Sequence, residues 1–205
     1  SSPDIRVAFF NTVCSKLLRC NKFLKNLLPV LSKLALHPAL RKQCSDPNAS
    51  FNDFFNFFEM SKERISELLR IKDIIILFTT EDGNGLLYPT KAFDYLIDTK
   101  TTLLGELLHS DVPVITNAPL DDPRLRRGEE RCVFQTNANM LSCRFSFEGK
   151  PEHELVLAFS EDNFSEADIT YMQIVVQYTS PALHLMSTIF NDLYPAATAE
   201  VLLKI

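Results

Sequence analysis

The sequence predicts an α+β domain: a central antiparallel sheet flanked by helices, preceded by an N-terminal helical extension. Two observations predict it. Short β-branched and aromatic runs, separated by turn dipeptides, occupy the middle of the chain and are typical of paired strands. Apolar residues with helical spacing precede and follow these runs. We therefore divide the chain into a basic helical extension with a linker (1–49), the domain (50–194), and a C-terminal tail or the start of a further linker (195–205).

The composition is that of a globular protein that can bury a core, with 46% hydrophobic and 23% charged residues among 205. No apolar run approaches the roughly 18 residues of a membrane-spanning helix, and the first residues lack a signal-peptide pattern. Because no Met opens the chain, we expect a fragment of a longer protein. The five cysteines are scattered without a C-x-x-C pair. We expect a cytoplasmic protein with reduced thiols, no metal and no cofactor.

The extension carries apolar residues at alternating spacings of three and four. This a/d seam predicts packing on another helix, as in a dimer. Its members are Phe10, Val13, Leu17, Cys20, Leu24, Leu27, Leu31 and Leu34. Pro29 predicts two helices or one bent helix, because proline lacks the N–H of the helical ladder. A second apolar set consists of Phe9, Cys14, Leu18 and Leu28. It favours packing against the chain's own domain as well, and both alternatives stay open.

Charge divides the chain in two. Eight basic residues and no acidic one lie between Ile5 and Gln43, which leaves 13 basic and 25 acidic residues after Gln43. An acidic domain would repel a phosphate backbone, so no nucleic-acid partner is expected. The basic extension is predicted to complement the acidic domain, either within one chain or across a dimer.

The domain opens with a helix predicted from Phe51 to about Ile71, with Ser50 and Asp53 as its capping box. The β-branched run 73–79 predicts a strand, and a D-G-N-G turn returns the chain into a partner strand at 86–88. The remaining elements are, in order, a helix over 99–109 capped by Asp98 or Thr99, a strand over 112–116, a charged loop over 117–128, strands over 139–147 and 153–160, and a helix over 166–194.

One passage points to a family. Leu103-Leu-Gly-Glu-Leu-Leu-His-Ser-Asp-Val-Pro-Val-Ile-Thr leads from a helix into a strand, and an Asp-Asp-Pro-Arg loop ending at Arg124 follows. From Phe51 to Tyr194 the chain resembles GAF domains, the small-molecule and dimerisation modules of cyclic-nucleotide phosphodiesterases, adenylyl cyclases and bacterial sensor kinases. Leu125 replaces the usual Phe of this loop, and Ser110-Asp111 stands where a Thr-Gly turn is common. The resemblance implies a GAF/PAS-like fold and a regulatory role.

The closing stretch departs from the signature of the cyclic-nucleotide-binding subset, which is Asn-Lys, a gap, then Phe-x-x-x-Asp-Glu. Phe164 and Asp168 match it, whereas Ser160-Glu161 and Ile169 do not. The resemblance therefore implies a degenerate cyclic-nucleotide signature. The same stretch also predicts an S-x-x-D capping box and a hydrophobic staple between Phe164 and Ile169, which would retain both matching residues without a ligand.

The resemblance implies a ligand pocket beneath the charged loop. The candidate ligand-binding residues are Asp121, Asp122, Arg124, Thr136, Asn137, Phe164 and Asp168. The arginine could pair with a phosphate or carboxylate, and the threonine and asparagine with a base or amide edge. The alternative is a solvated loop whose charges neutralise one another.

Catalytic chemistry is not predicted. Cys132 and Cys143 would be nucleophiles only with a lowered thiol pKa and a resolving partner. The four histidines are dispersed without metal-ligand spacing, and the acid pair Glu129-Glu130 is predicted to be solvated.

We predict a non-catalytic regulatory or sensory module that mediates homodimerisation and relays a small-ligand or partner signal through its flanking helices. The expected partners are a second copy, a small molecule, and a protein or output domain in the full-length chain. The alternative is a degenerate GAF fold that acts only as a protein-interaction scaffold, without a small-molecule ligand.

Overall fold

The computed structural model describes residues 3–35, 51–80, 82–89, 96–125, 128–131, 133–134, 137–146 and 153–202. Its elements are, from the N-terminus, α1 (Pro3–Ala35), α3 (Phe51–Leu69), β1 (Asp73–Thr79), β2 (Gly85–Leu87), β3 (Leu96–Asp98), α4 (Leu103–Leu108), β4 (Val114–Thr116), the 3-10 helix η1 (Pro119–Asp121), α5 (Gly128–Arg131), β5 (Asn139–Phe145), β6 (Glu154–Ser160) and α6 (Glu166–Leu202). This is the predicted α+β arrangement. Within the described residues, no helix is both long and apolar enough to span a membrane.

The sheet has six antiparallel strands in the order β3-β2-β1-β6-β5-β4. The two central strands are buried along almost their whole length, and only Asp73 of β1 and Ser160 of β6 escape burial. Ile75 lies opposite Leu157, which in turn lies opposite Ser142 of β5. Strands buried on both faces need a layer of structure on each side.

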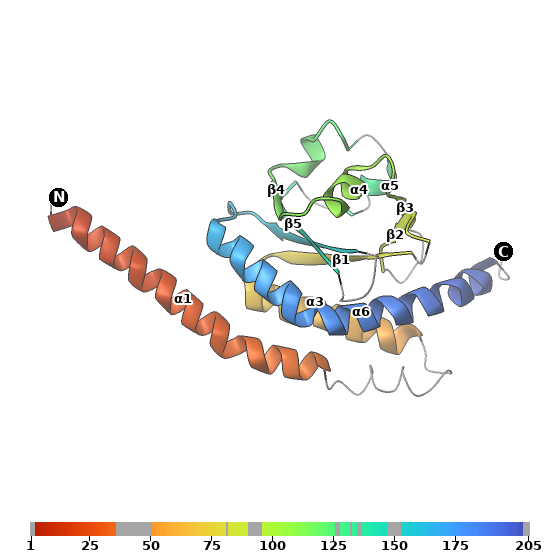
Figure 1. The fold of residues 1–205 in the computed structure, drawn as a ribbon, viewed down its shortest axis with the longest axis horizontal. Coiled ribbons are helices and arrows are strands. Elements are labelled where there is room, and N and C mark those ends of the chain that lie inside the picture. Colours follow the sequence, from red (N-terminus) through yellow and green to blue (C-terminus); the bar gives the residue numbers. More distant parts are fainter. Residues whose placement is uncertain are drawn as a thin grey trace.

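Each face of the sheet carries its own hydrophobic core, because alternate side chains of a strand point to opposite faces. Ile74, Ile76 and Phe78 of β1 pack with α3 and α6. Ile75 and Leu77 pack on the other face, with α4 and the segments that follow it. In Figure 1 the long helices α3 and α6 lie below the sheet and the short helices α4 and α5 lie above it. The candidate loop therefore belongs to the upper layer.

Helix α1 packs on the lower layer of its own domain. Phe23 is only 5% exposed, and its ring stacks on that of Tyr171 in α6 with centroids 4.6 Å apart. Leu27 and Val30 pack against the same core. The Arg19 guanidinium lies 5.0 Å from the centre of the Tyr171 ring. This packing shows that the basic extension folds against its own domain.

Some residues of the predicted seam of α1 pack on the domain, and others are exposed to solvent. Leu27 packs on the domain and Leu31 is half-buried, while the side chain of Leu34 lies outside the described residues. The exposed members are Phe10, Val13, Leu17 and Leu24. The second apolar set was predicted to face the domain, and this is wrong for three of its members: Phe9, Leu18 and Leu28 are each about 70% exposed (71%, 70% and 69%). The face that packs on the domain instead centres on Phe23.

Pro29 does not break α1, which continues from Pro3 to Ala35 with this proline inside it. Figure 1 shows the helix as one bent ribbon, which is one of the two predicted alternatives. The predicted capping box at Ser50 lies outside the described residues. The last helix extends past Tyr194 to Leu202.

Several predicted boundaries need correction. The helix predicted over 99–109 begins only at Leu103, and Thr102 caps it in place of Asp98 or Thr99. The strand predicted over 112–116 is shorter and begins after Pro113. Strand β3 was not predicted, because three residues are too short to show a periodic pattern and their pairing with β2 defines them.

Candidate functional site

Helix α4 is short, and its position depends on a close approach of backbone to backbone. A Cβ added to Gly105 would lie 2.0 Å from the carbonyl oxygen of Thr99. Only glycine therefore fits this turn of the helix. The Gly105 N–H donates to Thr102 Oγ1 over 3.1 Å, and His109 Nδ1 lies 2.6 Å from the Gly105 carbonyl oxygen.

A buried carboxylate holds the start of α4. Glu130 of α5 has no exposed surface, and its Oε1 accepts a hydrogen bond from the Leu104 N–H over 2.8 Å. The other oxygen, Oε2, has no hydrogen-bond partner among the residues that the structure describes. Burial raises the pKa of Glu130, because a charged carboxylate loses its hydration there. The prediction that this acid is solvated is therefore wrong.

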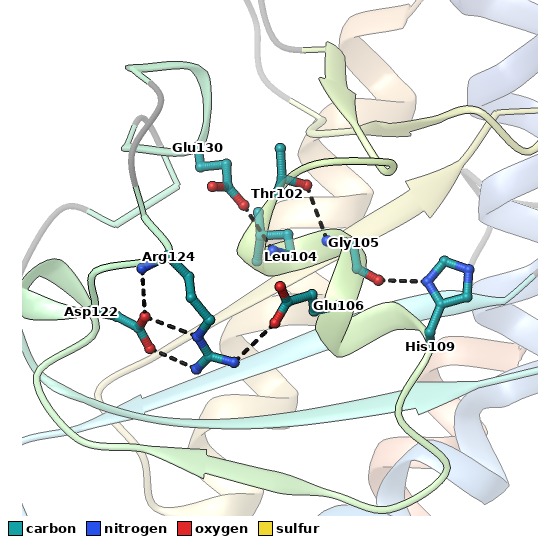
Figure 2. A network of polar contacts seen from close by, with 8 residues as sticks. All are labelled: Thr102, Leu104, Gly105, Glu106, His109, Asp122, Arg124 and Glu130. Carbon is teal, nitrogen blue, oxygen red and sulfur yellow. Dashed lines mark hydrogen bonds and ion pairs between the residues drawn. The ribbon is translucent and has the colours of Figure 1, made fainter.

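An ion-pair network joins the candidate loop to α4. Arg124 Nε and Nη2 donate to the two carboxylate oxygens of Asp122 over 2.9 and 2.6 Å, and Nη1 donates to Glu106 over 3.0 Å. Figure 2 shows the guanidinium between the two acids. The hydrogen bond from Arg124 lowers the pKa of Asp122, and both acids raise the pKa of Arg124. Asp122 and Arg124 therefore remain charged at neutral pH.

A second set of contacts fixes the turn before this arginine. Asn137 Oδ1 accepts from the Leu120 N–H and Asn137 Nδ2 donates to Asp121, both over 2.9 Å. Leu125 is 3% exposed and belongs to the upper core, where a phenylalanine is usual in the family that the sequence resembles. Asn137 thus anchors the loop at Leu120 and Asp121, and the buried side chain of Leu125 anchors it after Arg124.

The predicted ligand-binding residues fall into two groups. Asp121, Asp122, Arg124 and Asn137 lie together above the sheet. Phe164 and Asp168 lie on the other side of the sheet, at the start of α6, where Phe164 packs against the lower core. Thr136 lies outside the described residues. The structure therefore does not bring the predicted residues into one site.

The second group caps α6 and holds α1. Asp168 Oδ2 accepts from the Ser165 N–H over 2.7 Å, and the Asp168 N–H donates to Ser165 Oγ over 3.4 Å, so the predicted capping box is confirmed. Phe164 and Ile169 both pack on the lower core, as the predicted staple requires. Asp168 also forms an ion pair with Arg19 of α1. Its hydrogen bonds to Ser165 and Arg19 outweigh partial burial and lower its pKa.

The site residues that the sequence missed are Gly105, Glu106 and Glu130. Gly105 carried a local signal, since a lone glycine within an apolar helix often marks close packing. Glu106 and Glu130 carried none, because their partners lie 18 and 26 residues away in the chain.

The described residues include neither an activated cysteine nor a group of side chains placed to bind a metal ion. Cys143 is 7% exposed, and burial raises the pKa of its thiol to about 11. Cys132 lies outside the described residues. No group of three histidine, cysteine or acidic side chains within the described residues is placed to hold a metal ion.

Comparison with known proteins shows the fold. No family model and no curated protein matches the chain. Among solved structures, free methionine-R-sulfoxide reductase from Neisseria meningitidis superposes with a TM-score of 0.55 at 11% identity, over 81% of this chain and 90% of that one. The GAF domain of the phosphoenolpyruvate-protein phosphotransferase from Acinetobacter gives 0.54 at 12% identity, over 81% and 96%. Its counterpart from Coxiella burnetii gives 0.51 at 13% identity, over 84% and 98%. The chain has a GAF-like fold, as predicted.

Substituting Glu130 should separate its capping role from its charge. Glu130→Gln keeps an acceptor for the Leu104 N–H, whereas Glu130→Ala leaves that donor unsatisfied and should cost about 1–2 kcal/mol of unfolding free energy. The folded-state pKa of Glu130 lies above its ordinary value of 4.5, so wild-type stability should fall as the pH rises from 4.5 through the folded-state pKa. In Glu130→Gln, which has no carboxylate at this position, the free energy of unfolding should fall less over the same pH range.

Urea unfolding at a series of pH values measures both effects. Equal pH dependence in the wild type and in Glu130→Gln would show that the buried carboxylate does not titrate with folding. Equal stability of the Gln and Ala variants would show that the cap contributes nothing.

Proposed function

We propose that this chain is a non-catalytic regulatory module that pairs with a second copy through α1 and relays a signal along α1 and α6. The observation that carries the proposal is that α1 has two different apolar faces, one buried on the domain and one exposed to solvent. One face of this helix packs on the first turns of α6, and a neighbouring face presents a row of large apolar side chains to solvent. A helix placed in this way connects a second chain to the domain.

The exposed row supports pairing. Phe10 is 66% exposed, Leu17 64%, Leu24 56% and Leu28 69%. Phe10, Leu17 and Leu24 recur at the heptad spacing of the predicted seam, and Leu28 of the second apolar set lies one turn after Leu24. An exposed row of large apolar side chains marks an interaction surface on a protein. Burying each such side chain in a partner contributes about 1.5–3 kcal/mol. The same stripe on a second copy is the partner that the heptad spacing fits best.

The contacts between α1 and α6 support a relay. Phe23 stacks on Tyr171, and Arg19 pairs with Asp168, which also caps α6. A shift of α1 along its seam would have to break these contacts or move the start of α6 with it. A ligand or partner that binds one arrangement of the two helices more tightly would thereby shift the population toward that arrangement.

The absence of a catalytic role is supported by the state of Cys143. With a thiol pKa of about 11, only about one molecule in ten thousand carries the thiolate at pH 7. The sulfoxide reductase among the neighbours indicates that this fold is compatible with catalysis. In this chain, the described cysteine on the sheet is buried and unactivated.

The alternative role of a scaffold without a ligand has its own support. Asp122, Arg124 and Glu106 satisfy one another, and Asn137 satisfies Asp121 and the backbone of the loop. A loop whose charges are already paired does not need a ligand to be stable. The two versions of the function therefore differ in whether a small molecule binds, and both retain pairing through α1.

Pairing through the stripe predicts a dimer that a single charge disrupts. Leu17→Glu places two carboxylates in the seam of each dimer, and it should raise the dissociation constant by at least about 100-fold, since two buried leucines are lost. Light scattering at about 50 μM would measure this. Leu96→Glu is the matched control, because Leu96 is 49% exposed on the edge strand β3, away from α1. A monomeric wild type, or equal effects of the two variants, would contradict the proposal.

A sensor is distinguished from a scaffold by a thermal-shift screen against cyclic nucleotides, other nucleotides and small metabolites. A ligand at a hundred times its Kd should stabilise the protein by about 2.7 kcal/mol. For an anionic ligand of the loop, Arg124→Gln should remove the shift, whereas Arg64→Gln, at an arginine paired with Glu67 on α3, should not. No shift with any compound favours the scaffold.

A further inference from the structure

A basic groove lies between α1 and the turn that follows α3. It is a hollow of about 640 Å³. Its lining residues are Ser15, Leu18, Arg19, Asn21, Lys22, Lys25, Asn26 and Arg70. Four of these eight side chains are cations and none is a carboxylate. The groove therefore concentrates positive charge on a chain whose net charge is −5.

Three of these cations have no counter-charge among the described residues. Arg19 pairs with Asp168, but Lys22, Lys25 and Arg70 form no ion pair with any residue that the structure describes. Lys72, two residues after Arg70, is by contrast paired: its Nζ lies 2.5 Å from a carboxylate oxygen of Glu161. Lys16 and Lys100 outside the groove also form no ion pair with a described residue, so the groove is distinguished by the three unpaired cations that gather along its walls.

The spacing of the cations brings them onto one face. Arg19, Lys22 and Lys25 follow one another at intervals of three, so their side chains are neighbours on the surface of α1. Like charges at this spacing repel one another, and a fourth cation, Arg70, faces them from the other wall of the groove. An anion between the walls would remove this repulsion.

The lining also defines the chemistry of the anion. Leu18 is the one large apolar side chain of the groove, while Ser15, Asn21 and Asn26 offer hydroxyl and amide groups. Guanidinium and ammonium groups together suit phosphate oxygens, the first as a fork of donors and the second as a point charge. The volume admits several linked phosphates, and several cations would engage more than one of them.

We propose that this groove binds a soluble polyphosphate-type anion, which ties α1 to the turn after α3. The site lies below the sheet and shares no residue with the candidate loop. It also leaves the exposed apolar stripe of α1 free, so it does not depend on the proposed function. Bound anion should strengthen the attachment of α1 to its domain, because it neutralises the repulsion between the cations of α1 and Arg70.

Titration calorimetry with tripolyphosphate tests the site. Lys22→Gln/Lys25→Gln removes two lining charges, and Lys16→Gln/Lys100→Gln removes two exposed charges outside the groove, so both variants have the same net charge. We expect the first variant to bind at least about tenfold more weakly than the wild type, at about three- to fivefold for each surface charge contact. The second should bind within about twofold of the wild type. Equal weakening would show general charge attraction and overturn the proposal.

Arg70→Asn tests the opposite wall. Arg70 has a left-handed backbone with φ 56°, which asparagine tolerates well, so the variant should fold normally. It should weaken binding about three- to fivefold, and an unchanged melting temperature without anion would exclude a structural cause. Unchanged affinity would show that Arg70 does not contact the anion, and it would overturn the proposal that the anion ties α1 to the turn after α3.

A comparison with vesicles separates two sources of phosphate. Vesicles with phosphatidylinositol bisphosphate present the same groups on a surface. Sedimentation with such vesicles, combined with no heat of binding for tripolyphosphate, would overturn the proposal of a soluble ligand. The proposal of a soluble ligand is supported if tripolyphosphate binds in the absence of vesicles and if Lys22→Gln/Lys25→Gln abolishes this binding.

Discussion

The burial of β1 and β6 on both faces is the constraint on which the rest of the structure depends. Neither strand leaves more than one end residue outside the core, so each face of the sheet must be covered along its length. Helices α3 and α6 cover one face with long apolar surfaces. Among the described residues, the other face is covered by the six-residue α4, the short α5 and the loops around them. The two layers are therefore stabilised in different ways.

The upper layer uses polar contacts where the lower layer uses helix length. A helix as short as α4 cannot satisfy its own terminal N–H groups, so Thr102 and Glu130 accept hydrogen bonds from them. Arg124 then ties the following loop to Glu106 of the same helix. The charges that make this loop look like a binding site thus also hold its own layer together. In the lower layer, Asp168 combines both roles of a helix cap and an ion pair.

Local patterns predicted what depends on neighbours in sequence. The run 73–79 has three consecutive isoleucines within an apolar stretch from 74 to 78, and its strand has the predicted bounds. The capping box of α6 needs only four consecutive residues, and it too was predicted. Burial of Glu130 depends on a helix 26 residues away, which no local pattern reveals. The spacing in α1 predicted a helix with a wide apolar surface, but it could not distinguish the face around Phe23 from the exposed seam, because both are apolar.

Whether α1 and α6 act as one unit is tested most directly by hydrogen exchange of the α1 amides in the Leu17→Glu background, which removes pairing between chains. Asp168→Asn keeps an acceptor for the cap of α6 and removes the charge that holds Arg19. It should accelerate exchange in α1 about fivefold, for a pair of about 1 kcal/mol, and leave the exchange of β1 and β6 unchanged. The matched control is Asp162→Asn, an exposed acid of the same segment. Unchanged exchange of α1 in Asp168→Asn would contradict a mechanical link between the two helices.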